Sequence, residues 1–179
     1  GMYLNSSNPT LTDVSFSNNE ADVWGGGMFT TFSNPTLTNV IINENISESA
    51  GGGIVMHYSN PILIDVIISG NKVEAGIGGG IYAENSDATL TNASINDNRA
   101  ERGGGIYLKD HSNCIISHSI IRKDTAIISG GGIMIENSDP TLLNVTISDN
   151  ESYQGGGLVF YHSDLTLSHM TISGNQADY

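Results

Sequence analysis

The triplet Gly-Gly-Gly occurs six times in this chain, and a similar run of residues follows each copy. The triplets begin at Gly25, Gly51, Gly78, Gly103, Gly130 and Gly155. Counted from Gly1 and from the last glycine of each triplet, seven units start at residues 1, 27, 53, 80, 105, 132 and 157, with a spacing of 25–27 residues. A fixed period of this length is typical of a solenoid rather than of a globule with one central core.

The seven units account for residues 1–179, so we interpret the chain as one elongated domain. Both ends coincide with unit boundaries, and no polar end cap is visible. Because solenoids hide their terminal cores under such caps, we expect this domain to be a fragment of a longer protein whose targeting and anchoring segments lie elsewhere. Uncapped coils also predict end-to-end stacking, with another copy or with flanking coils.

Within each unit, apolar and polar residues alternate, which is the pattern of a β-strand. In the fourth unit the runs cover residues 81–84, 89–91 and 93–95. Hairpins would reverse the direction of every second copy, so each strand must pair in parallel with its copy in the next unit. The sequence therefore predicts an all-β, single-stranded parallel solenoid of about seven coils, with three short strands per coil.

Three columns of apolar residues are expected to form the interior. The residue after the last glycine of each triplet is Met2, Met28, Ile54, Ile81, Ile106, Ile133 or Leu158. The middle column holds Leu11, Leu37, Leu63, Leu90, Ile116, Leu142 and Leu167. The third holds Phe16, Ile42, Ile68, Ile95, Ile121, Ile147 and Ile172.

Three residues after each member of the third column stands an asparagine, or once an aspartate. The set is Asn19, Asn45, Asn71, Asn98, Asp124, Asn150 and Asn175. Stacked carboxamides can form hydrogen-bonded ladders, and asparagine tolerates the left-handed backbone of a sharp corner. We interpret this column as structural, and the glycine triplets as a second corner that needs positive φ or close backbone approach. Asn-Pro or Asp-Pro at Asn8, Asn34, Asn60 and Asp139 marks a third corner.

Acidic residues outnumber basic ones by 19 to 6, which gives a formal net charge of -13. Polyanions would be repelled, which argues against nucleic acid and anionic membrane surfaces as partners. No apolar run is long enough to insert directly into a membrane. The single cysteine, Cys114, cannot form an internal disulfide. The acidic residues lack the spacing of a calcium loop, so we expect no metal and no cofactor.

The paired motifs Gly79-Gly80-Ile81 with Ile95-Asn96-Asp97-Asn98, and the segment Phe16-Ser17-Asn18-Asn19, resemble the repeats of polymorphic outer-membrane proteins, which are autotransporter-type adhesins. The chain departs from those repeats in having Gly-Gly-Gly in place of Gly-Gly-Ala and mostly Ile in place of Phe. The resemblance implies a secreted, right-handed parallel β-helix of the pectin-lyase-like class, displayed on a bacterial surface. We expect the chain to be an adhesin stalk or a ligand-presenting scaffold without catalytic activity.

Function is expected on the outward columns, because the core is repetitive. One column is unusually apolar and is expected to form an exposed strip, with Tyr3, Phe29, Tyr82 and Tyr107 as candidate ligand contacts and Tyr161 in the adjacent column. Exposed aromatic rings flanked by polar groups can stack on carbohydrate or on a host or cell-surface protein. Aromatic stacking between neighbouring strands would equally stabilise the sheet itself.

The outward columns also suggest two alternative functions. Glu84 and Glu136 stand two coils apart, about 9.6 Å from one another at ~4.8 Å per coil, near the upper limit of inverting glycosidases. Lys109 lies between them, which equally predicts a surface ion-pair ladder. Thr-x-Thr pairs at residues 10–12, 36–38, 89–91 and, as Thr-x-Ser, 166–168 suggest an ice-binding face. The neighbouring Cys114, His118 and Ser119 are interpreted as a drifted coil rather than a catalytic triad.

Overall fold

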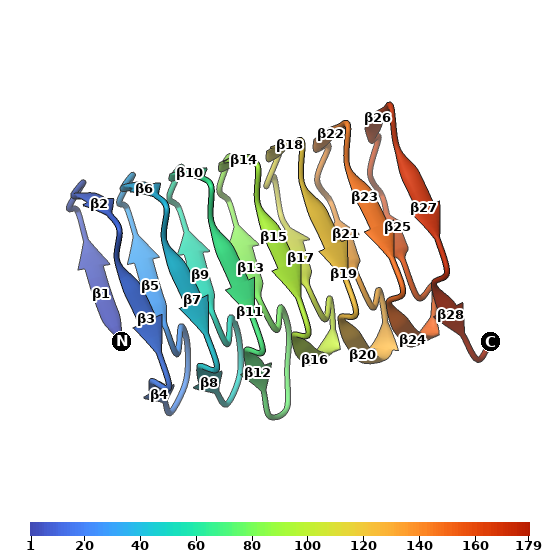
Figure 1. Cartoon of the computed structure of the whole chain (residues 1–179), viewed down its shortest axis with the longest axis horizontal. Coiled ribbons are helices and arrows are strands. Elements are labelled where there is room, and N and C mark those ends of the chain that lie inside the picture. Colours follow the sequence, from blue (N-terminus) through green and yellow to red (C-terminus); the bar gives the residue numbers. More distant parts are fainter.

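The computed structural model describes all 179 residues as a solenoid of 28 short strands in four seven-stranded parallel sheets. Figure 1 shows the coils side by side along the longest axis, with the two termini at opposite ends. Every neighbouring pair within a sheet is parallel, as the unit-by-unit repeat predicts. We number the coils 1 to 7 from the unit starts above, and name the sheets A to D in the order in which the chain visits them.

Each sheet takes one strand from every coil. Sheet A contains β1 (Met2–Asn5), β5 (Met28–Thr31), β9 (Ile54–His57), β13 (Ile81–Glu84), β17 (Ile106–Lys109), β21 (Ile133–Glu136) and β25 (Leu158–Tyr161). Sheet B contains β2 (Thr10–Thr12), β6 (Thr36–Thr38), β10 (Ile62–Ile64), β14 (Thr89–Thr91), β18 (Ile115–Ser117), β22 (Thr141–Leu143) and β26 (Thr166–Ser168).

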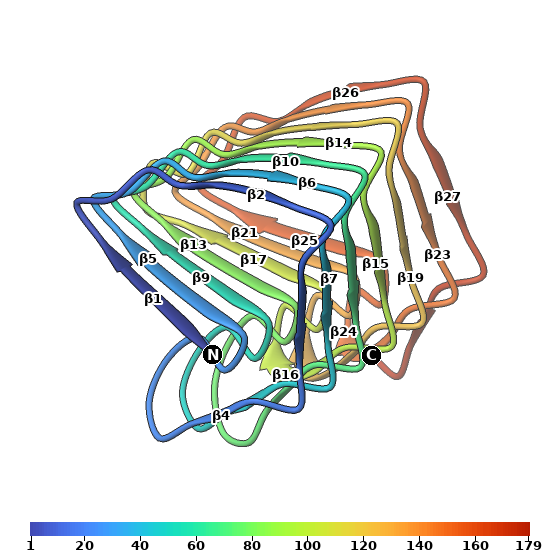
Figure 2. The same cartoon turned by 60° about the vertical axis from the view of Figure 1, so that its left-hand side comes forward.

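The chain then passes through the other two sheets. Sheet C contains β3 (Ser15–Ser17), β7 (Ile41–Asn43), β11 (Ile67–Ser69), β15 (Ser94–Asn96), β19 (Ile120–Arg122), β23 (Thr146–Ser148) and β27 (Thr171–Ser173). Sheet D contains β4 (Glu20–Ala21), β8 (Ile46–Ser47), β12 (Lys72–Val73), β16 (Arg99–Arg102), β20 (Thr125–Ser129), β24 (Glu151–Gln154) and β28 (Gln176–Ala177). Sheets A, B and C form three sides of a prism, and sheet D lies at the corner between C and A (Figure 2).

The fourth sheet corrects the prediction of three strands per coil. The sequence pattern of this segment indicates a variable loop, because only one position points inward and small or medium residues fill it instead of a large core side chain. The inward residues are Ala21, Ser47, Val73, Ala100, Ala126, Ser152 and Ala177, and in coils 2 to 6 they are buried. Backbone pairing with the neighbouring coils therefore specifies this strand more than its side chains do.

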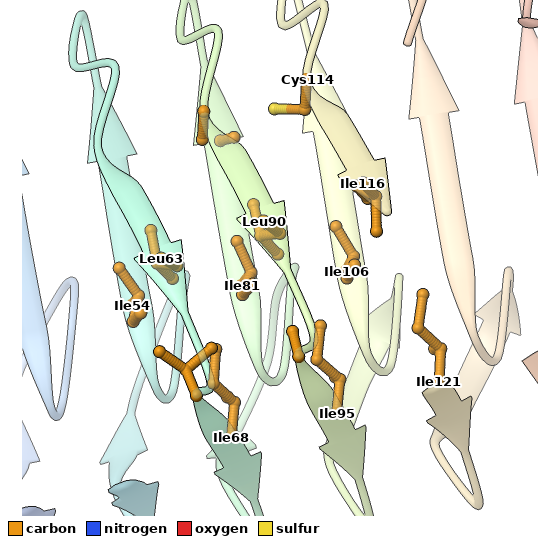
Figure 3. Close-up of a cluster of buried hydrophobic side chains, with 14 of the residues drawn as sticks. Ile54, Leu63, Ile68, Ile81, Leu90, Ile95, Ile106, Cys114, Ile116 and Ile121 are labelled. Carbon is orange, nitrogen blue, oxygen red and sulfur yellow. The ribbon is translucent and has the colours of Figure 1, made fainter. Parts of the chain in front are cut away.

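The three predicted apolar columns form the interior, as Figure 3 shows for coils 3 to 5. Register places Ile81 beside Ile106, Leu90 beside Ile116, and Ile95 beside Ile121. Like side chains thus stack along the axis, and most members of the central coils are at most 2% exposed. Burying each of these side chains contributes about 1.5–3 kcal/mol by transfer from water, which makes the stacked columns the main source of stability.

The predicted asparagine ladder is confirmed. In coil 2, the backbone N–H and the side-chain amide of Asn45 both donate to Oδ1 of Asn71, each at 3.0 Å, and the amide also donates to the carbonyl of Phe16 at 2.9 Å. The same set recurs at Asn71 and Asn150. Each amide thus connects three successive coils, and its burial gives these hydrogen bonds low-dielectric strength.

Two further ladders were not predicted. In the first ladder, the backbone N–H of the serine after the A–B corner donates to the hydroxyl of the corresponding serine in the next coil. The N–H of Ser33, for example, donates to Oγ of Ser59 at 3.0 Å, and this hydroxyl donates to the carbonyl of His57 in its own coil. The second ladder is formed by the Asn or Asp that follows this serine. Its backbone N–H donates to the side-chain oxygen of the corresponding residue in the preceding coil, as the N–H of Asn60 does to Oδ1 of Asn34 at 2.6 Å. These ladders explain why Ser-Asn/Asp recurs in every unit.

One left-handed residue turns the chain at each corner, except at the A–B corner of coil 5, where Asp110 and His111 both have positive φ. The A–B corner uses Phe32, the B–C corner Asn39 and the C–D corner Glu44, while the D–A corner uses the first glycine of each triplet, such as Gly78 with φ of 65°. The left-handed residue at the C–D corner precedes the ladder asparagine, so the ladder residues themselves do not carry the positive φ that was expected of them.

The second and third glycines serve close approach instead of positive φ. A Cβ on Gly80 would lie 2.7 Å from the carbonyl oxygen of Gly105 and 3.1 Å from Nδ2 of Asn98. Neither neighbour can withdraw without breaking the pairing between coils. Gly70, in contrast, lies at the C–D corner, where a Cβ would meet nothing nearer than 3.5 Å.

These two glycines give a matched pair of variants. Gly80→Ala is expected to destabilise the protein by about 1–3 kcal/mol, the range of overpacking in a close-packed interior. Gly70→Asn is expected to stay within about 0.5 kcal/mol of the parent, since asparagine tolerates left-handed φ. Urea unfolding measures both, and equal losses for the two variants would contradict the assigned roles.

Candidate functional site

The outward side of sheet A carries the column predicted to bind ligands. Register aligns Tyr3 with Phe29, Phe29 with Val55, Val55 with Tyr82, and Tyr82 with Tyr107. Met134 and Val159 complete this outer column of sheet A. Its membership is therefore as expected from the sequence.

The expected exposure of that column is wrong in the central coils. Tyr82 is 6% exposed and Tyr107 is 2% exposed, and together with Val55, Met134 and Ala50 they form a second buried apolar cluster. The D–A corner covers them: Trp24, Ala50, Ile77 and Arg102 bridge from coil to coil beside sheet A. Loops after β4, β8 and β12 project outward at this corner in Figure 2. Tyr82 and Tyr107 therefore stabilise the cover, and Tyr3 alone of the column remains widely exposed.

The two buried phenols are tied to the candidate acids. The hydroxyl of Tyr107 donates to Oε2 of Glu136 at 2.5 Å. Burial raises the pKa of Tyr107, and the hydrogen bond and charge of Glu136 raise it further. Burial likewise raises the pKa of Tyr82, followed by the charge of Glu84 and the hydrogen bond to it. Each glutamate thus has a partner within the protein.

Register places Glu84, Lys109 and Glu136 in adjacent positions, as predicted. The ion-pair ladder between them does not form, because Lys109 and Glu84 lie closer to other partners. Nζ of Lys109 is 3.4 Å from Oδ2 of Asp110, and Oε2 of Glu84 is 3.7 Å from Nε2 of His57. No single cleft contains both glutamates. The structure therefore does not bring the proposed pair of acids together around a substrate.

Glu136 lies in a cleft of about 330 Å³ at the D–A corner of coils 4 to 7. The cleft lies beside a bulge in β20, which has one extra residue between Ala126 and Ser129 relative to both neighbouring strands, β16 and β24. Such a bulge locally bends a strand away from its neighbours. The lining residues are Arg102, Ile128, Ser129, Met134, Glu136, Gln154, Tyr161 and His162. Tyr161, a predicted ligand contact, therefore lies in this cleft.

Exposed and half-buried aromatic rings gather across coils 1 to 3. Phe32 and Tyr58 stack with a centroid distance of 5.3 Å and an interplanar angle of 12°, and His57 packs edge-on to Tyr58 at 4.5 Å. The ring centroid of Trp24 lies 5.6 Å from that of Phe29 and 6.2 Å from that of His57. We call Trp24, Phe29, Phe32, His57 and Tyr58 the aromatic ledge. Tyr3 extends it, with its ring centroid 5.2 Å from that of Phe29.

Phe32 and Tyr58 hold the least expected backbone conformation of the ledge. Both have φ of 48°, in the left-handed region. Coils 4 and 6 fill the same corner position with Asn85 and Asn137, for which that conformation is ordinary. A bulky aromatic residue there stores strain, on the order of 1–3 kcal/mol. The sequence contained a signal for this pair, since two aromatic residues occupy one column in adjacent coils.

The threonine face lies on sheet B as predicted, with Thr10 beside Thr36 and Thr12 beside Thr38. Ile62 and Ile64 interrupt the array in coil 3, and Ile115 and Leu143 interrupt it further along. Ile62 and Ile115 are exposed. Ice binding by this face stays a prediction.

The cysteine of coil 5 is part of the core. Cys114 occupies the column that holds Pro35, Pro61 and Pro140 in other coils and Ala88 in coil 4. It is 1% exposed, and burial raises the pKa of its thiol to about 12. Ser119 donates to the carbonyl of Ser117 and accepts from Ala93, so it belongs to the coil's own hydrogen bonding.

The state of Cys114 can be checked directly. In the folded protein at pH 8, a thiol reagent is expected to modify less than about a tenth of the cysteine over a time in which denaturant allows complete modification, because the thiolate is the reactive form. Cys114→Ala is expected to fold with less than about 1.5 kcal/mol loss, since the same column accepts Ala88. Rapid labelling of the folded protein would contradict the buried position.

No group of three or more His, Cys, Asp or Glu side chains is arranged to hold a metal ion. The fold is built of strands alone, and no helix long and apolar enough to cross a membrane occurs in it.

Comparison with known families gives one result. The family described as the right-handed β-helix region matches residues 1–88 and again residues 79–178, so that its two matches together cover almost the whole chain. No curated protein matches the sequence.

Proposed function

The chain belongs to the right-handed β-helix family, and we propose that it is a non-catalytic, extracellular segment that presents a ligand-binding surface. In this proposal it acts as an adhesin stalk or scaffold on a bacterial surface, and the aromatic ledge is its contact with carbohydrate. The observation that carries the proposal is the pair Phe32 and Tyr58, stacked, exposed and held in a strained backbone conformation.

Strain at these two positions favours a function over a structural role. Their exposed fractions are 61% and 48%, so the rings gain little from burial in the fold. Asparagine would satisfy the same corner at lower cost, as it does in coils 4 and 6. Strained residues persist where they serve a site. Rings presented on a rigid stack lose little entropy on binding, which suits the weak, repeated contacts of a saccharide chain.

The polar surroundings of the ledge suit a neutral, hydroxyl-rich ligand. His57 and Glu84 lie 3.7 Å apart at its edge, where a carboxylate can accept from sugar hydroxyls and an imidazole can donate or accept. The net charge of -13 works against polyanionic ligands. A host or cell-surface protein remains the alternative partner, and its glycans would be the groups contacted.

A second candidate is a carbohydrate-active enzyme, and the cleft around Glu136 is the observation that favours it. Glu136, Arg102 and His162 all line this cleft. Glu84 lies outside it, so such an enzyme would need a second acid or base other than the one predicted from the sequence. The phenol of Tyr107 donates to Glu136, which supports a positioning role for the phenol in either function.

Binding by the ledge is tested with the double variant Phe32→Asn and Tyr58→Asn. The variant is expected to bind glycans on an array about fivefold to 150-fold more weakly, as loss of two stacking contacts of roughly 0.5–1.5 kcal/mol each predicts. It is also expected to melt at the same or a higher temperature, because the strain is relieved. A purely structural role for Phe32 and Tyr58 would not predict weaker binding together with an unchanged or higher melting temperature.

Tyr153→Ala is the matched control, since Tyr153 is an exposed tyrosine on β24 that packs against Tyr179 away from the ledge. Unchanged binding by the double variant would reject the ledge as the site, and a lower melting temperature would reject the strain argument. A reducing-sugar assay on the same glycans distinguishes the two functions: release of reducing ends that Glu136→Gln abolishes would replace the scaffold with the enzyme.

A further inference from the structure

One rung of the asparagine ladder is an acid. Coil 5 places Asp124 where the coils on either side have Asn98 and Asn150. The side chain of this aspartate is fully buried. Asparagine and aspartate have nearly the same shape, so the substitution replaces one amide nitrogen, a donor, with a carboxyl oxygen that can be ionised or protonated.

Oδ1 of Asp124 takes over the role of the amide oxygen. It accepts from the backbone N–H of Asn98 at 2.8 Å and from the side-chain amide of Asn98 at 2.9 Å. The backbone N–H of Asp124 donates in turn to Oδ1 of Asn150 at 2.9 Å. The ladder therefore runs through coil 5 without a change of register.

Oδ2 lies in the place of the amide nitrogen. A Cβ on Gly105 would meet Oδ2 of Asp124 at 2.7 Å, just as a Cβ on Gly80 would meet Nδ2 of Asn98 at 3.1 Å. In the other coils that nitrogen donates to a core carbonyl one coil back and to the Oδ1 of the next rung. The corresponding acceptors here are the carbonyl of Ile95 and Oδ1 of Asn150. Oδ2 is the one buried side-chain polar atom in the protein that has no hydrogen-bond partner.

An ionised carboxylate cannot satisfy this position. It would direct a negative charge toward two acceptor oxygens in a buried site, and such a group costs several kcal/mol to bury. A carboxylic acid has one O–H, which can donate to either oxygen as the missing amide would.

We propose that Asp124 is protonated in the folded protein, that its hydroxyl donates in place of the missing amide, and that loss of this proton loosens the contact among coils 4, 5 and 6. The solenoid then contains one acid-stabilised link in an otherwise pH-independent ladder. This inference rests on the ladder alone and is independent of the aromatic ledge.

The electrostatic surroundings agree with the neutral acid. Burial raises the pKa of Asp124 well above its usual range, and the charge of Asp97 raises it further, while the two donors of Asn98 lower it by a smaller amount. The other charged side chains on adjoining segments lie at the surface, and these are Arg99, Arg122, Lys123, Asp149 and Glu151. None of them forms an ion pair with Asp124.

The direction of the pH dependence follows from linkage. Because the folded-state pKa exceeds the unfolded value of about 4, the contribution of Asp124 to stability is complete below pH ~4 and is lost as the pH rises toward the folded pKa. In that interval the folding equilibrium constant falls about tenfold per pH unit through this one group. The variant Asp124→Asn has no titrating group at this rung, so it lacks this dependence.

The experiment compares Asp124→Asn with the parent by urea unfolding from pH 4 to pH 8. The ratio of their folding constants is expected to rise in favour of the variant by about tenfold per pH unit above pH ~4, until the folded pKa is reached. Asp149→Asn is the matched control: it removes one surface acid next to the ladder and leaves the rungs intact. A ratio that does not change with pH, or a variant less stable than the parent at pH 7, would overturn the proposal.

The protonation state of the Asp124 carboxyl can also be measured directly by NMR. In protein labelled with ¹³C at aspartate carboxyls, the Asp124 signal, identified by its absence from Asp124→Asn, is expected at the shift of a protonated acid at pH 6. An ionised signal at pH 6 would reject the proposal whatever the stability data showed.

Discussion

The structure depends on each coil lying within hydrogen-bonding distance of the next around its entire perimeter. Of 119 backbone hydrogen bonds, 68 involve turns or loops, and at the corners they also join successive coils, as the N–H of Gly79 donates to the carbonyl of Gly103, the copy of Gly78. The corners are therefore paired as closely as the sheets. This requirement explains the narrow range of unit lengths, since an extra residue must either bulge outward or break the pairing. It also explains the glycines, where any Cβ would separate two backbones.

The core columns and the ladder could be predicted from the sequence, because the same local pattern of residues recurs in all seven coils. Alternation identified the core columns, and the recurrence of asparagine identified a ladder. What could not be predicted depends on contacts that leave a weak pattern. Sheet D shows a single small inward residue, such as Ala100, within a stretch of otherwise variable sequence. The cover over Tyr82 and Tyr107 comes from corner segments of differing length, so alternation alone pointed the rings outward without saying what lay above them.

Departures from the repeat are the places where the physical argument points to function. A column that is filled by one residue type in every coil is explained by packing or pairing. Phe32 and Tyr58 depart from the polar residues that fill the same corner in the other coils, at a cost in backbone strain. Strand β20 departs from the common register beside the cleft that contains Glu136, and Asp124 departs from an amide ladder. Each departure carries a local cost that the regular coils on either side can offset.

The same one-dimensional construction keeps these features separate. In a stack, each coil contacts only its neighbours, so a perturbation decays over a few coils instead of spreading through a common core. The ledge spans coils 1 to 3, and the acid rung acts on coils 4 to 6. A ligand bound to Phe32 and Tyr58 would stabilise coils 2 and 3 without changing the proton on Asp124. The cleft at Glu136 differs, because Arg102 and Ser129 lie on β16 and β20, the strands that follow the rungs Asn98 and Asp124. Loosening at Asp124 would therefore reach the cleft before it reached the ledge.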